Sequence, residues 1–83
     1  LRVGESVEEI LKADLELEYD ALPLLKDAIA HCESVRDYVS RDLFAEILES
    51  EEEHVDFLET QFDLIKQMGI QNYVQMQSKP VEG

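Results

Sequence analysis

The chain has 83 residues, enough for one small domain that buries a modest share of its surface. It carries 20 Asp and Glu against 7 Lys and Arg, and this formal net charge of -13 argues against nucleic-acid or anionic-membrane partners and favours cations. No apolar run is as long as a signal-peptide core or a membrane span, and a single cysteine, Cys32, excludes an internal disulfide framework. We therefore expect a cytoplasmic protein, and the first residue, Leu1, suggests a processed or partial chain.

Few glycines and prolines, three and two, leave little room for β-structure and favour an all-α fold. The first predicted helix covers 6–33 after a lead-in loop at 1–5. Ser6 and Glu9 have the spacing of a capping box, so we expect Ser6 to be the N-cap. A second line of apolar residues at seven-residue spacing, Ile10, Leu17 and Leu24, widens the apolar surface beyond what one neighbouring helix can cover.

Glu18 interrupts the main apolar stripe of this first helix. The stripe stays in phase on both sides of Pro23, so we expect the proline to kink the helix and not to end it. Its members are Val7, Leu11, Leu15, Leu22, Leu25 and Ile29.

The second predicted helix covers 37–68, with Asp37 or Ser34 as its cap and Gly69 as its terminating residue. The short connection makes the two long helices antiparallel neighbours. A short terminal helix over 70–77 and a tail at 78–83 complete a single partial domain: a helical hairpin that must pack against something else.

Glu51 and His54 lie three positions apart in the second helix, so their side chains point in a similar direction. At about 100° per residue that direction is the apolar one. A buried carboxylate without a charged partner or a metal is costly. The apolar residues that share this face are Phe44, Ile47, Leu48, Val55, Leu58, Phe62 and Ile65.

Glu18, Glu51 and His54 are thus predicted to face inward from one hairpin, with Asp14 as a candidate fourth group. Oxygen and imidazole ligands suit iron or manganese, and without thiolates a structural zinc site is a poor alternative. Di-iron bundles take one Glu from each of two helices and Glu-x-x-His from each of the other two. The hairpin has one of each, or half of a di-iron site. The simpler alternatives are a solvated Glu run beside a surface His, and a Glu18 paired with Lys or Arg.

At this point the sequence resembles the bacterioferritins, and the likeness extends over most of the chain. Read in this way, the chain is similar to the C-terminal half of a subunit: the third and fourth bundle helices and the short fifth. The matching segments are Leu1-Arg2-Val3-Gly4-Glu5, Asp37-Tyr38-Val39-Ser40-Arg41-Asp42, Glu51-Glu52-Glu53-His54, Phe57-Leu58-Glu59-Thr60 and Met68-Gly69-Ile70-Gln71-Asn72-Tyr73.

The resemblance implies a ferroxidase centre in which Glu18 is a terminal carboxylate ligand, Glu51 bridges two irons and His54 is a terminal ligand. It implies oxidation of Fe(II) by dioxygen or peroxide and storage of the Fe(III) mineral in a closed cage of about 24 subunits. It also implies haem b, held between two subunits by a Met of the absent N-terminal half, so no haem ligand is assigned in this chain.

Two helices with half of a metal site are not expected to hold iron alone. We expect a second polypeptide, the N-terminal half-chain, to supply the other two bundle helices. The alternative function is non-enzymatic: an acidic helical hairpin that dimerises as an interaction module, with Glu18 and His54 paired across the interface.

Overall fold

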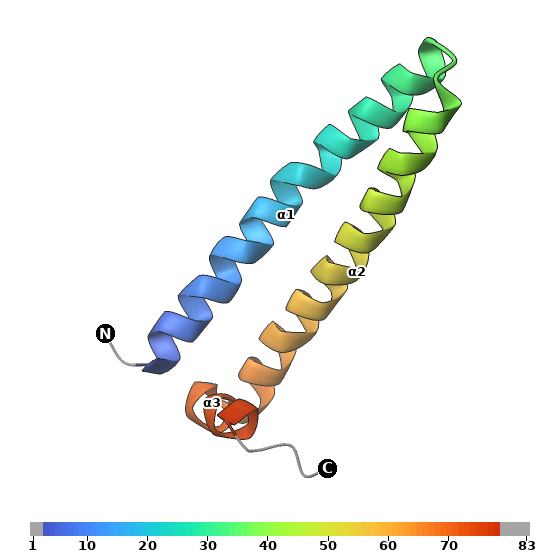
Figure 1. Ribbon diagram of the computed structural model, residues 1–83. Coiled ribbons are helices and arrows are strands. Elements are labelled where there is room, and N and C mark those ends of the chain that lie inside the picture. The colour runs from blue at the N-terminus through green and yellow to red at the C-terminus, as the bar shows by residue number, and fades with distance from the viewer. Residues whose placement is uncertain (1–2, 79–83) are drawn as a thin grey trace, which may run out of the picture.

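The structure, a computed structural model, describes residues 3–78. These residues form three helices and no strand: α1 (Val3–Ser34), α2 (Tyr38–Met68) and α3 (Ile70–Ser78). The long helices run antiparallel as a hairpin and α3 lies across its open end (Figure 1). The all-α prediction is confirmed, and the predicted tail falls outside the described residues beyond position 78.

α1 begins earlier than the capping pattern predicted. It starts at Val3, so Ser6 lies inside the helix and the assignment of Ser6 as N-cap is wrong, as is the loop predicted over positions 3–5. Leu1 and Arg2 lie outside the described residues. The helix continues through Pro23 to Ser34, as the unbroken apolar phase predicted.

A tight turn joins the two long helices. The Asp37 N–H donates to the Cys32 carbonyl at 2.8 Å, across Arg36, whose backbone is left-handed at φ 62°. Asp37 is the N-cap of α2, because its side chain accepts a hydrogen bond from the Ser40 N–H at 3.1 Å. Asp37, one of the two predicted caps, therefore starts the second helix. Cys32 is buried and is a free thiol.

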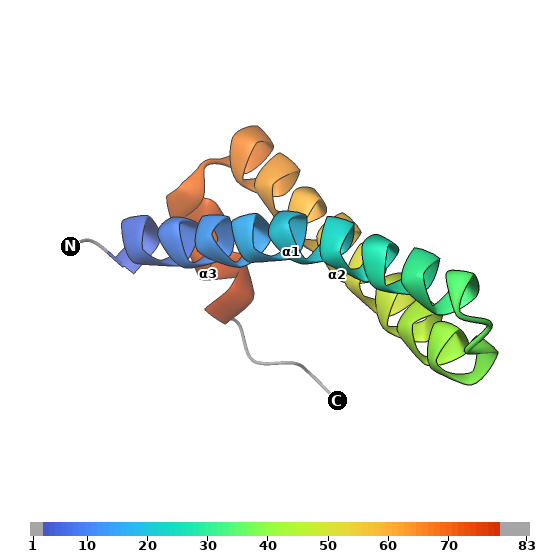
Figure 2. The same ribbon diagram turned by 90° about the horizontal axis from the view of Figure 1, so that it is seen from above.

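The buried core lies between the long helices and under α3. Its most buried members on α2 are Val55, Leu58 and Ile65, and Leu58 is only 1% exposed. These residues are spaced three and seven apart, which gives one face of a helix turned towards its neighbour. The two helices diverge towards the α3 end (Figure 2), so a further element is needed to close the hairpin there.

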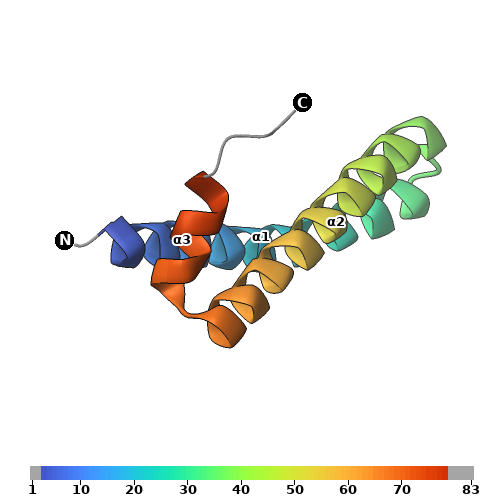
Figure 3. The same ribbon diagram turned by 90° about the horizontal axis from the view of Figure 1, so that it is seen from below.

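α3 closes that end. Gly69 at φ 83° ends α2, and its N–H donates to the Ile65 carbonyl at 2.8 Å, as expected for a glycine that terminates a helix. α3 then leaves the end of α2 and crosses α1 (Figure 3), and it contacts both long helices. Tyr73 is 4% exposed, and its hydroxyl donates to Oε1 of buried Gln61 at 2.7 Å.

The molecule is elongated and exposes much apolar surface. Its radius of gyration is 17.2 Å, whereas a compact domain of this length has about 12 Å. Large apolar side chains lie bare along both long helices; Leu17 and Leu24 are 67% and 69% exposed. Within residues 3–78, no helix is both long and apolar enough to span a lipid bilayer.

We predict that Tyr73→Phe destabilises the chain by about 1 to 3 kcal/mol, because Gln61 keeps a buried carbonyl that has lost its donor. Denaturant unfolding followed by circular dichroism measures this loss. Tyr38→Phe, at a half-exposed tyrosine, is the matched control. The double variant Gln61→Leu/Tyr73→Phe should lose less than Tyr73→Phe alone, and a larger loss in the double variant would contradict this account.

Stability should also depend on the ionisation of Asp37. Hydrogen bonds from Ser40, through its side chain and then its backbone N–H, lower the pKa of Asp37. Because the folded-state pKa is depressed, the stabilisation is complete above the unfolded value of about 3.9 and is lost as the pH falls through the folded-state pKa. Unfolding midpoints of the wild type and Asp37→Asn, a cap that does not titrate, should converge over that range. A difference that does not change with pH would contradict it.

Candidate metal centre

An open groove of about 510 Å³ runs along one side of the hairpin and brings two of the three predicted ligands together. Glu18 from α1 and Glu51 from α2 both line it, although they are far apart in sequence. The rest of the lining is apolar and comes from both helices: Leu17, Ala21, Leu24, Leu25, Ala28, Phe44 and Ile47. The groove is therefore an apolar trough with two acidic residues in its wall.

Glu18 has an unusual environment for a carboxylate. Its Oε2 atom is buried and has no hydrogen-bond partner. Removing a carboxylate oxygen from water without a partner is costly, so such an atom requires a cation or a donor, and residues 3–78 supply neither. The ion-pair alternative for Glu18 is thus not met within the described chain.

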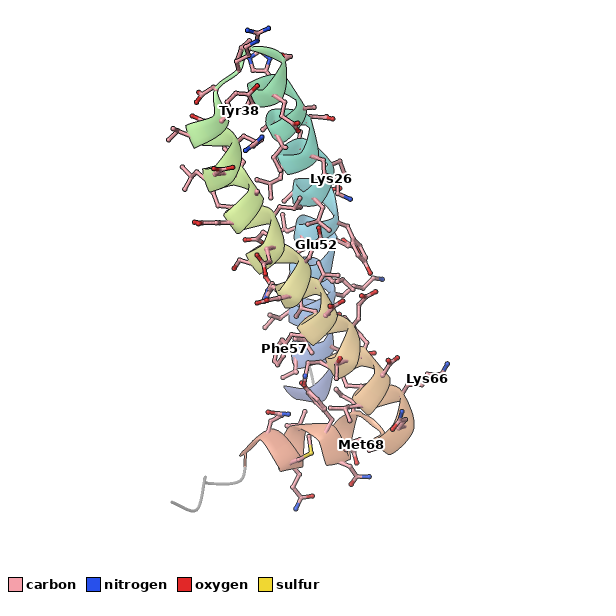
Figure 4. The ribbon with its side chains drawn as sticks, turned by 90° about the vertical axis from the view of Figure 1, so that its right-hand side faces the viewer. Lys26, Tyr38, Glu52, Phe57, Lys66 and Met68 are labelled. Carbon is pink, nitrogen blue, oxygen red and sulfur yellow. The ribbon has the colours of Figure 1, made fainter. Side chains whose placement is uncertain are left out.

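Lys26, Lys66 and Arg41 do not supply a cation to Glu18. Lys26 and Lys66 extend away from the helix pair (Figure 4). The Arg41 guanidinium pairs with the neighbouring Asp42 at 2.9 Å and lies over the Tyr38 ring. Neither arrangement brings a cation to Glu18.

His54 takes a different position from the two carboxylates. It is half-buried on α2, but it is not among the residues that line the groove. Its imidazole stacks on the Phe57 ring, with centroids 6.4 Å apart and an interplanar angle of 16°. Asp14, the candidate fourth group, is exposed. Over the described part of the chain, no three His, Cys, Asp or Glu side chains are clustered closely enough to hold a metal ion.

A polar contact between α1 and α2 involves Tyr19, the residue after Glu18. The Tyr19 hydroxyl donates to Oε2 of Glu59 at 2.9 Å. This hydrogen bond raises the pKa of Tyr19, because only the protonated phenol can donate it; partial desolvation and the negative charge of Glu59 act in the same direction. Successive helical residues differ in direction by about 100°, so Tyr19 and Glu18 serve different faces of α1.

Sequence reasoning did not identify the Tyr19–Glu59 and Tyr73–Gln61 contacts. A signal existed for Gln61: it stands in the apolar register between Leu58 and Ile65, where a polar residue must find a partner. No such signal marks Glu59, because it is one of many exposed carboxylates of α2.

Comparison with known proteins agrees with this architecture. The family model described as Ferritin-like domain matches residues 2–68. The chain belongs to the ferritin-like family. This ferritin-like chain is 46% identical over 82 residues to a bacterioferritin of Brucella melitensis and 49% identical over 78 residues to a bacterial ferritin of Synechocystis. A bacterial ferritin of Neisseria meningitidis is 46% identical over 78 residues.

The chain spans about half the length of the curated relatives that it matches. The matches cover 99% of this chain but 51% of the Brucella protein, and 93% of this chain but 50% of the Synechocystis protein. The hairpin is thus similar to half of a longer ferritin-like protein.

Glu18 should weaken the fold of the isolated chain. We predict that Glu18→Leu raises the free energy of unfolding by about 1 kcal/mol or more, because it removes a buried oxygen that has no partner. Denaturant titration in the presence of a chelator measures the change. Glu52→Leu, at an exposed position of α2, controls for the gain in apolarity. A destabilised Glu18→Leu variant would mean that this carboxylate is satisfied in the folded chain.

Proposed function

We propose that this chain contributes one hairpin and half of the ligands of a di-iron ferroxidase centre in an iron-storage protein. The observation that supports this most is the buried, unpartnered Oε2 of Glu18 in the wall of a groove that Glu51 also lines. Membership of the ferritin-like family and similarity to bacterioferritins favour iron over other cations that carboxylates bind.

Each residue has a role that its chemistry fits. Glu18 is proposed as a terminal carboxylate ligand, Glu51 as a carboxylate shared by two irons, and His54 as a terminal imidazole ligand. The His54 imidazole lies nearly parallel to the Phe57 ring. Once a partner covers the groove, its apolar wall lowers the local dielectric, which strengthens the attraction between ionised carboxylates and a cation. Iron held there supplies electrons to dioxygen or peroxide, and the Fe(III) product is stored in a cage built from many subunits.

The proposed centre is complete only when a second hairpin supplies another Glu and another Glu-x-x-His. We propose that the N-terminal half-chain, with the first two bundle helices, fills that role in the full protein. Haem b remains a prediction of the resemblance, with its Met ligand in that half. A cytoplasmic location likewise remains a prediction, in keeping with the free thiol of Cys32.

An Fe(II) oxidation assay tests the proposal. The half of the Brucella melitensis bacterioferritin that this chain does not match is joined to the N-terminus of this chain, and anaerobic Fe(II) is followed by a pulse of oxygen. We expect about two Fe(II) per fusion to be oxidised rapidly. Glu18→Ala and His54→Ala should each lose most of this fast phase, because each removes a ligand of the pair.

Glu52→Ala is the matched control, because Glu52 is an exposed carboxylate next to Glu51. The fusion that carries Glu52→Ala should oxidise iron as the parent fusion does. Unchanged fast oxidation in both Glu18→Ala and His54→Ala would refute the ferroxidase assignment. That result, together with a stable apo dimer of the chain, would favour the non-enzymatic interaction module.

A further inference from the structure

One face of the hairpin is left open around the groove. Leu17 and Leu24 of α1 and Ile47 of α2 line the groove and are 67%, 69% and 38% exposed. Ile10 continues the α1 line one heptad earlier and is 64% exposed. We call these four residues, with Glu18 and Glu51, the open face. Contiguous apolar surface of this kind marks a binding surface on a soluble protein.

The chain exposes more surface than a compact monomer of its mass. The chain exposes 6435 Å². A compact monomer of its mass, 9.6 kDa, would expose about 5100 Å². The excess of about 1300 Å² is spread over the whole elongated chain, and it exceeds the roughly 800 Å² that each partner buries in a standard specific interface.

One copy has half of the metal ligands of a di-iron site, and a second copy would supply the other half. One chain offers two carboxylates and one imidazole, from Glu18, Glu51 and His54, and no trio of metal-binding side chains meets in its described residues. Two copies offer four carboxylates and two imidazoles. That is the full donor set of a di-iron carboxylate bundle: two single Glu and two Glu-x-x-His.

We propose that, in the absence of another hairpin, a second copy of this chain docks on the open face and the two copies together bind two divalent cations. The contact is isologous: each open face covers the other about a two-fold axis. Each copy gives Glu18 and Glu51 from that face, with His54, which lies outside the groove, as the third proposed donor. This inference rests on the ligand roles proposed above, and it names a second partner that can complete the same site.

Charge makes this association depend on metal. Each copy has a formal net charge of -13, and docking brings two Glu18 carboxylates, each with one buried oxygen, together with two Glu51 carboxylates. Like charges in an apolar site repel strongly. Two divalent cations carry the four positive charges that balance these four carboxylates. The dimer is therefore favoured with metal and disfavoured without it, because binding only to the dimer shifts the equilibrium towards it.

Native mass spectrometry and sedimentation velocity of the chain alone test the proposal, with Co(II) as a redox-stable probe whose visible spectrum reports its ligands. With chelator we expect a monomer. With Co(II) we expect twice that mass and two metal ions per dimer. Glu18→Ala should abolish the Co(II)-induced dimer, while Glu52→Ala should retain it.

An apolar substitution separates docking from metal binding. Leu17→Lys, at an exposed position that leaves the monomer core intact, should also abolish the dimer, whereas Val35→Lys in the turn should not. Circular dichroism confirms that both variants remain helical. A monomer at every Co(II) concentration would overturn the proposal, as would a dimer that survives both chelator and Glu18→Ala. If the chain stays monomeric while the Brucella fusion still oxidises iron, this inference fails and the ferroxidase assignment stands.

Discussion

The carboxylate of Glu18 sets the main constraint on this hairpin. One of its oxygens is buried without a partner, in a trough whose other residues are almost all apolar. A chain that only needed to be stable would place a leucine there, because the stripe on both sides of Glu18 is leucine and isoleucine. The position therefore supports the proposal that a cation and a covering partner complete the fold. Glu18 lowers the stability of the isolated hairpin, and it lies in a groove that is proposed to bind metal only when a second hairpin covers it.

The rest of the hairpin holds this groove open in a defined shape. The short turn capped by Asp37 keeps α1 and α2 adjacent at one end. At the other end the helices diverge, and α3 fills the gap with Tyr73 bonded to Gln61. The Tyr19–Glu59 bond joins the helices between these ends. Glu18 and Glu51 are thus supported by contacts on faces that leave the groove free.

Two different partners are proposed for the open face of the hairpin. In the relatives, the chain corresponds to about half of the protein, and the remaining half is the proposed natural cover. A second copy has the same donor types at symmetry-related positions, so metal can hold two copies together when that half is absent. Both arrangements place carboxylates from two hairpins around one pair of cations. The two proposed arrangements differ in which hairpin binds the open face. In both of them Glu18 binds a cation.

The sequence by itself determined the local features. Heptad spacing predicted two long helices, the unbroken phase across Pro23 predicted a single α1, and Gly69 predicted the end of α2. The register also placed Glu18 and Glu51 on faces that meet. Only the tertiary structure decided that the oxygen of Glu18 stays unpartnered, that His54 lies outside the groove and stacks on Phe57, and that α1 begins before Ser6. The reason is that periodicity gives each side chain a direction around its own helix. It does not give the rotation and divergence of one helix relative to another, which arise from packing along the whole length of the pair.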